Sequence, residues 1–91
     1  MSVVTEFRIR VEMVQGYCSC GYQEGDTFSC EGMNTPAVSF CGGAYIVLFP
    51  MQVALQSGAR FCFEENPKCK TKLACPDNGN VVFSIELLEK E

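Results

Sequence analysis

The stretch that decides the fold is residues 7–13, which read Phe-Arg-Ile-Arg-Val-Glu-Met. Apolar and charged side chains alternate strictly along it, so the apolar ones share one side of an extended chain and the charged ones share the other. A two-residue period of this kind is typical of a strand with one buried face. The stretch therefore predicts a β-strand that packs one face against the core.

Two further strands are predicted, at residues 81–88 and at residues 27–30. Residues 81–88 carry an apolar face of matching length, with Val81, Phe83, Ile85 and Leu87 in alternate positions. Residues 27–30 follow the turn residues of 21–26 and place Phe28 and Cys30 on one face. We expect the first and last strands to share a sheet, and the short strand to form a hairpin with the first.

A helix is predicted over residues 44–57. Apolar residues recur there at helical spacing, at Ala44, Val47, Leu48, Met51 and Leu55, and Ser57-Gly58 is a typical helix end. Pro50 cannot donate a hydrogen bond and clashes with the preceding turn. We therefore expect one Pro-broken helix, or two short helices.

Residues 64–80 are polar, contain Pro67 and Pro76, and predict a long loop. The alternating Lys68, Lys70 and Lys72 indicate a solvated edge or loop. The whole pattern predicts an α+β fold in which a small, mainly antiparallel sheet carries the Pro-broken helix or the two short helices. A length of 91 residues favours a single domain, residues 1–91.

Charge and hydropathy bear on the class of partner. The net charge is −4 and the seven basic residues are scattered, which argues against nucleic-acid binding. The longest apolar run, residues 44–55, is interrupted by Pro50 and Gln52 and is short for a membrane span. No secretory signal is visible at residues 1–8. We therefore expect a soluble, cytoplasmic protein without a membrane or nucleic-acid partner.

Seven cysteines are the most informative part of the composition. An odd number cannot pair fully within one chain, and thiols inside a cell stay reduced, so metal binding or redox chemistry is indicated. One C-x-C pair, Cys18 and Cys20, is present and no C-x-x-C, which differs from zinc ribbons and common ferredoxins. Any metal site must be assembled from distant positions.

Topology brings some of these cysteines together. Cys18 follows the first strand and Cys75 precedes the last, so antiparallel pairing of the two strands would make them neighbours. Cys41 lies at or just ahead of the helix start, where free backbone N–H groups favour a thiolate. Whether Cys41 reaches the other two depends on residues 31–40, and periodicity does not decide it.

The chain also resembles a family of small, uncharacterised, cysteine-containing bacterial and archaeal proteins. The likeness is carried in order by Cys18-x-x-Gly21-Tyr22-x-x-Gly25-Asp26, Cys41, Leu48-x-Pro50, Ala54-Leu55-x-x-Gly58-Ala59 and Cys75-Pro76-Asp77. It implies that three of the cysteines belong to a shared pattern and that the other four are particular to this chain. The pattern often has His in place of Tyr22, and Pro-Trp in place of Cys62-Phe63.

These observations predict a small metal-binding accessory protein, and not an enzyme on its own. Cys18, Cys41 and Cys75 are its expected ligands, and Cys20 or Asp77 is the candidate fourth ligand. An iron–sulfur cluster is preferred because of the scattered spacing and the Cys75-Pro76 step, with zinc as the alternative. We expect it to act together with another protein, such as a redox enzyme.

Two other functions stay open at this point. In the first, the protein is a metal-free interaction or accessory subunit, and its cysteines are small buried apolar side chains. The dense apolar stretch at residues 45–49 would then belong to the core or face a partner. Alternatively, Cys41 is the reactive thiol of a redox protein, resolved by a second cysteine. The chain has no histidine, which rules out a Cys–His nucleophile pair.

Overall fold

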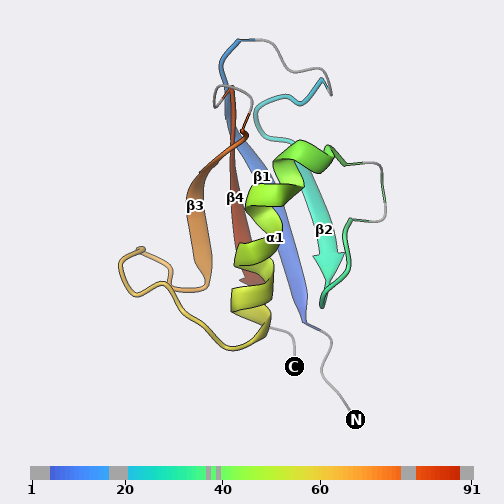
Figure 1. Cartoon of the computed structure of the whole chain (residues 1–91). Helices are drawn as coiled ribbons and strands as arrows, with labels where there is room; N and C mark the ends of the chain where they lie inside the picture. Colours follow the sequence, from blue (N-terminus) through green and yellow to red (C-terminus); the bar gives the residue numbers. More distant parts are fainter. Residues whose placement is uncertain (1–4, 17–20, 37, 39, 77–79, 89–91) are drawn as a thin grey trace.

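The computed structural model describes residues 5–16, 21–36, 38, 40–76 and 80–88. Its elements in chain order are β1 (Glu6–Val14), β2 (Thr27–Glu31), α1 (Gly42–Gln56), β3 (Cys69–Ala74) and β4 (Val81–Leu88). The strands form one sheet in the order β2-β1-β4-β3, and every neighbouring pair is antiparallel. The helix lies across one face of this sheet (Figure 1). The predicted α+β fold with an antiparallel sheet is confirmed.

The centre of the sheet is the pairing of β1 with β4 that the alternating patterns predict. Phe7 lies opposite Leu87, Ile9 opposite Ile85, and Val11 opposite Phe83. All six side chains are buried beneath α1, and five of them, all but Leu87, are fully inaccessible to solvent. Burial of this apolar area is the main stabilising contribution to the fold.

The hairpin of β1 and β2 is also as predicted, with Glu6 opposite Glu31 and Arg10 opposite Thr27. The alternation of β1 ends earlier than the sequence indicates, because the register with β4 shifts between Val11 and Met13. Such a β-bulge changes the direction of the side chains that follow it. Met13, predicted on the buried face, is 41% exposed.

The helix runs without a break from Gly42 to Gln56, with Pro50 inside it. The expected break at Pro50, and the alternative of two short helices, are therefore wrong. Pro50 lies on the exposed side, while Leu48 and Leu55 are buried against the sheet. This packing outweighs the cost of about 3 kcal/mol for an interior proline. Within the part of the chain that the structure describes, no helix is long and apolar enough to cross a membrane.

The predicted loop of residues 64–80 is wrong in one respect, because it contains the edge strand β3. Its register with β4 shifts between Lys70 and Leu73, and Lys72 has a φ of 60°. The bulge breaks the two-residue period, so the stretch Cys-Lys-Thr-Lys-Leu-Ala carries no alternating apolar pattern. The lysines do lie at an edge of the sheet, and Lys72 is exposed there.

Candidate functional site

One end of the molecule collects the elements that carry the candidate cysteines. The strands β1 and β3 both end there, and α1 begins there (Figure 1). The Gln15 N–H donates to the carbonyl of Asn80 (2.6 Å), and the Cys75 N–H donates to the carbonyl of Val81 (2.8 Å). The chain segments that leave β1 and β3 are thus both held to the start of β4.

Cys41 is the N-cap residue of α1, which confirms its predicted place just ahead of the helix. Its backbone is extended, with φ −65° and ψ 119°, and its side chain makes no capping hydrogen bond. The first turn of the helix contains no acidic side chain. The N–H groups and the dipole at this end of α1 therefore favour negative charge at the cap position, and no carboxylate of the first turn competes for it.

Tyr22 links Cys41 to the sheet. The N–H of Cys41 donates to the Tyr22 hydroxyl at 2.7 Å. The Tyr22 ring contacts that of Phe83, with 5.7 Å between ring centroids, and Phe83 lies opposite Leu73, two residues before Cys75. Cys41 and Cys75 are both half-buried and pack against the same core. The Tyr22 side chain therefore joins the cap of α1 to the core of the sheet.

The other predicted ligands cannot be located. Cys18, Cys20 and Asp77 lie outside the described residues, so their approach to Cys41 and Cys75 stays a prediction. Among the residues that the structure does describe, no group of three or more Cys, Asp or Glu side chains is arranged to hold a metal ion. The structure therefore places two of the three predicted thiols at one end of the fold and leaves the third untested.

The three described cysteines outside the predicted set have different surroundings. Cys62 is exposed, Cys69 is half-buried and Cys30 is buried. Burial raises the pKa of the Cys30 thiol above its ordinary value. Burial, followed by the nearby carboxylate of Glu86, raises the pKa of Cys69. Both shifts disfavour the thiolate, which is the reactive form and the ligand form.

Alkylation by iodoacetamide should follow this order. We expect Cys62 to react first among Cys30, Cys62 and Cys69, and Cys30 to react last in the folded protein. Because burial raises the pKa of Cys30, its reactive thiolate is scarce at neutral pH, and the rate at Cys30 should rise as the pH is raised. Peptide mapping by mass spectrometry measures each rate. Equal rates at Cys30 and Cys62 in folded protein would show that the thiol of Cys30 is not protected.

A buried polar network, which the sequence analysis missed, joins α1 to the segment after β2. Gln52 is completely buried, and its amide N–H₂ donates to the carbonyls of Gly32 and Asn34, at 2.9 Å each. Its amide oxygen accepts from the Tyr45 hydroxyl and from the Cys30 thiol. Burial raises the pKa of Tyr45, so this hydroxyl stays protonated and donates. The available signal was Gln52 itself, a polar residue four positions after Leu48 on the buried stripe.

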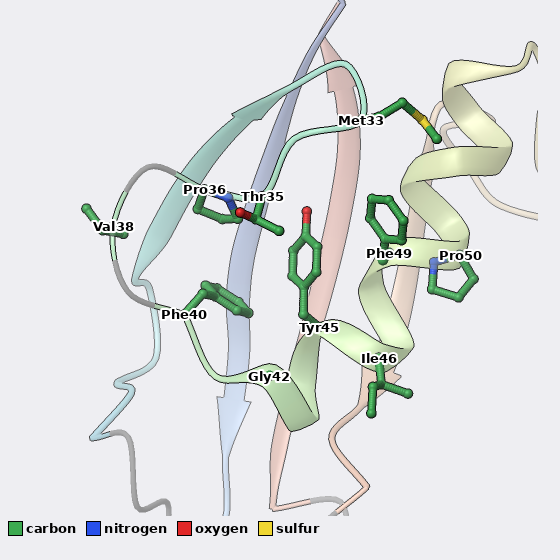
Figure 2. Close-up of a pocket in the computed structure, with 10 residues that line it drawn as sticks. All are labelled: Met33, Thr35, Pro36, Val38, Phe40, Gly42, Tyr45, Ile46, Phe49 and Pro50. Carbon is green, nitrogen blue, oxygen red and sulfur yellow. The ribbon is translucent and has the colours of Figure 1, made fainter.

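An open apolar groove lies between α1 and the segment that Gln52 holds (Figure 2). It measures about 560 Å³ and is lined by Met33, Thr35, Pro36, Val38, Phe40, Gly42, Tyr45, Ile46, Phe49 and Pro50. The rings of Phe40, Tyr45 and Phe49 lie in a row, with centroids 5.5 and 5.7 Å apart. Of the stretch at residues 45–49, Tyr45 and Leu48 belong to the core, whereas Ile46 is 70% exposed at the groove.

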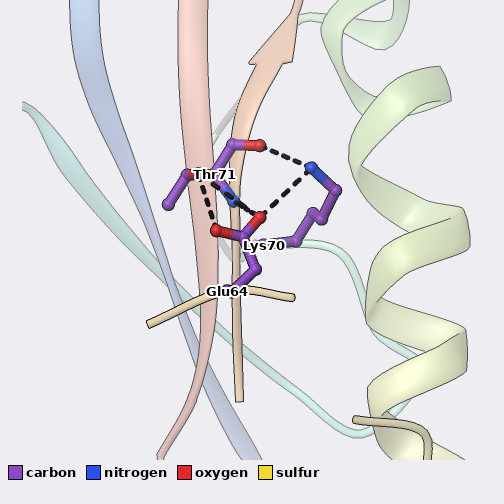
Figure 3. Close-up of polar contacts among 3 residues, drawn as sticks. All are labelled: Glu64, Lys70 and Thr71. Carbon is purple, nitrogen blue, oxygen red and sulfur yellow. Dashed lines mark hydrogen bonds and ion pairs between the residues drawn. The ribbon is translucent and has the colours of Figure 1, made fainter. Parts of the chain in front are cut away.

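A third cluster, on the edge strand β3, is structural. The Glu64 carboxylate accepts from the Thr71 N–H and hydroxyl, at 3.3 and 3.1 Å, and pairs with the Lys70 ammonium at 3.3 Å (Figure 3). The hydrogen bond from the Thr71 backbone is the largest cause that lowers the pKa of Glu64. These contacts hold the connection after α1 against the bulged part of β3.

Comparisons of the chain with models of known protein families, with curated proteins and with solved structures find no match. The resemblance described above therefore stays a prediction. The candidate functions depend on the geometry of the two regions just described, the cysteine end and the apolar groove.

Proposed function

We propose that this protein binds a metal centre through the thiolates of Cys18, Cys41 and Cys75. The observation that carries the proposal is the common position of two segments, because the cap of α1 and the residue after β3 lie at the same end of the fold. The chain leaves β1 at this same end, and Gln15, three residues before Cys18, is bonded to Asn80. The chain therefore leaves β1 at the end of the fold that holds Cys41 and Cys75, three residues before Cys18.

The chemistry of this end suits a thiolate centre. Cys41 lies where the helix dipole stabilises negative charge, and Cys41 and Cys75 are only half-buried, so a cluster bound there could still be reached by a redox partner. Three thiolates hold three irons of a [4Fe–4S] cluster, and Cys20 or Asp77 supplies a ligand for the fourth. A zinc ion would take the same four ligands in a tetrahedron. We prefer the iron–sulfur cluster and keep zinc as the alternative.

The test is metal analysis of protein purified without oxygen. We expect iron and acid-labile sulfide in the protein, together with visible charge-transfer absorption. Replacement of Cys18, Cys41 and Cys75 together by Ser should abolish both. The matched control is Cys62→Ser, which removes an exposed thiol that follows the C-terminal end of α1 and should leave the metal content unchanged.

The outcomes separate the remaining functions. Stoichiometric zinc without colour would support the zinc version of the centre. A colourless, metal-free sample that is folded would contradict both versions and favour the metal-free accessory protein. In that case the triple Ser variant should keep its fold, whereas a fold that depends on metal should be lost with the ligands.

A further inference from the structure

We propose that the apolar groove between α1 and the facing residues Met33, Thr35, Pro36, Val38 and Phe40 binds one small, uncharged, mainly apolar molecule, and that this site is distinct from the thiolate centre. The first support is the distribution of exposed apolar side chains. Among the described residues, the large apolar side chains that are exposed are Met13, Met33, Val38, Ile46 and Phe63. Three of these five line the groove, so the exposed apolar surface is concentrated there rather than scattered.

The second support is that described residues beside the groove, Asn34 and Phe40, are held by contacts to the rest of the fold. Gln52 donates to the backbone carbonyl of Asn34, which ties the start of the facing segment to α1. At its other end, the Phe40 ring packs against Phe28 at 4.9 Å and against Tyr45 at 5.5 Å. Residues that are already anchored lose less conformational freedom when a ligand binds beside them, so less binding free energy is lost.

Size and charge define the ligand. A volume of about 560 Å³ lies within the range of about 300–1,000 Å³ that is common for sites of single small molecules. None of the ten lining residues is charged, so a charged group would lose hydration without gaining a partner. The row of rings from Phe40, Tyr45 and Phe49 offers flat apolar faces, and the Thr35 hydroxyl offers one polar contact (Figure 2). The groove is thus complementary to a neutral molecule with an aromatic or similarly flat apolar body.

The same charge argument disfavours a second copy of the chain as the occupant. Each copy carries a net charge of −4, and the groove contains no basic side chain that would offset the repulsion between two copies. The thiol of Cys41 is not among the groups that line the groove, although its neighbours Phe40 and Gly42 are. Binding in the groove therefore needs neither the metal nor the candidate ligands.

The experiment is titration with 6-propionyl-2-(dimethylamino)naphthalene, an uncharged fluorescent naphthalene. We expect saturable binding of one probe per chain, with a blue shift and a micromolar dissociation constant. Ile46→Asp, on the rim of the groove, should weaken binding by about tenfold or more, because it removes apolar contact and introduces an unpaired charge.

Phe63→Asp is the matched control, since Phe63 is 73% exposed, close to the 70% of Ile46, and does not line the groove. It should bind the probe as the wild type does. If Ile46→Asp fails to fold, Val38→Asp, on the opposite wall of the groove, is titrated in its place and should show the same loss of probe binding. Absence of saturable binding, or equal losses in the groove variant and the control, would overturn the proposal.

Two further outcomes bear on the nature of the occupant. Tighter binding of the anionic 8-anilinonaphthalene-1-sulfonate than of the neutral probe would contradict an uncharged ligand. Sedimentation velocity should show a monomer at the concentrations of the titration. A wild-type dimer that becomes a monomer in Ile46→Asp would assign the groove to a second copy and overturn the proposal.

Discussion

Phe83→Ala is expected to lower the free energy of unfolding by about 4 kcal/mol, the largest effect of any single substitution considered for this chain. Phe83 is completely buried in β4, opposite Val11 of β1. Its ring also contacts Tyr22 and Phe40, at 5.7 and 5.9 Å between centroids. Removal of the ring deletes apolar burial and leaves a cavity at the point where the sheet, the helix cap and the groove meet. Urea denaturation followed by circular dichroism measures the change.

The control for this prediction is Phe63→Ala. Phe63 is 73% exposed, so the same chemical change there should alter the free energy of unfolding by less than about 1 kcal/mol. Domains of this size are stable by about 5–15 kcal/mol, so the loss at Phe83 should be a large fraction of the total. Similar losses in the two variants would mean that Phe83 is not part of a close-packed core.

Gln52→Leu should be nearly as destabilising, by about 3 kcal/mol. The two side chains are similar in size, but leucine cannot donate to the carbonyls of Gly32 and Asn34, and it cannot accept from the buried Tyr45 hydroxyl and Cys30 thiol. Hydrogen bonds made by a completely buried side chain are costly to lose, and the apolar gain of leucine does not offset the loss of all four. The midpoint and slope of urea denaturation give the free energy.

Gln56→Leu provides the comparison, since Gln56 is the last residue of the same helix and is exposed. It should change the stability by less than about 0.5 kcal/mol. A double-mutant cycle of Gln52→Leu with Tyr45→Phe should give losses that are smaller than additive, because both changes remove the same hydrogen bond between the two side chains. Additive losses would indicate that the two side chains do not act as one network.

The regular parts of the fold could be predicted because each follows a simple period. β1 and β4 alternate residue by residue over most of their length, and α1 repeats its apolar side chains at helical spacing. The errors lie where the backbone departs from a period. The bulge at Met13 and the bulge in β3 each shift the register by one residue, which removes the pattern that prediction uses. At Pro50, packing of the buried side of α1 outweighs the local preference to break the helix.

The candidate site was only partly predictable, for a related reason. Cys41 could be placed at the start of α1, because helix limits are readable from the chain. The hydrogen bond from the Cys41 N–H to the Tyr22 hydroxyl joins residues that are 19 positions apart, and no local sequence pattern encodes such a contact. Helical spacing places Leu48 on the buried stripe and leaves Ile46 off it, so an exposed apolar patch at residues 45–49 could be expected as an alternative. The groove itself could not, because no local pattern shows that the segment after β2 packs beside α1 and forms the facing wall.

The two edges of the sheet differ in a way that bears on how chains of this protein meet. β2 pairs regularly with β1 along its whole length, whereas β3 is bulged and turns at Lys72, whose φ is 60°. Bulges and lysines on an edge strand hinder the addition of another strand. Strand addition between chains would thus join β2 to β2 and leave two bulged β3 edges outermost. Growth of a continuous sheet stops at such a pair, which protects the fold against fibre formation.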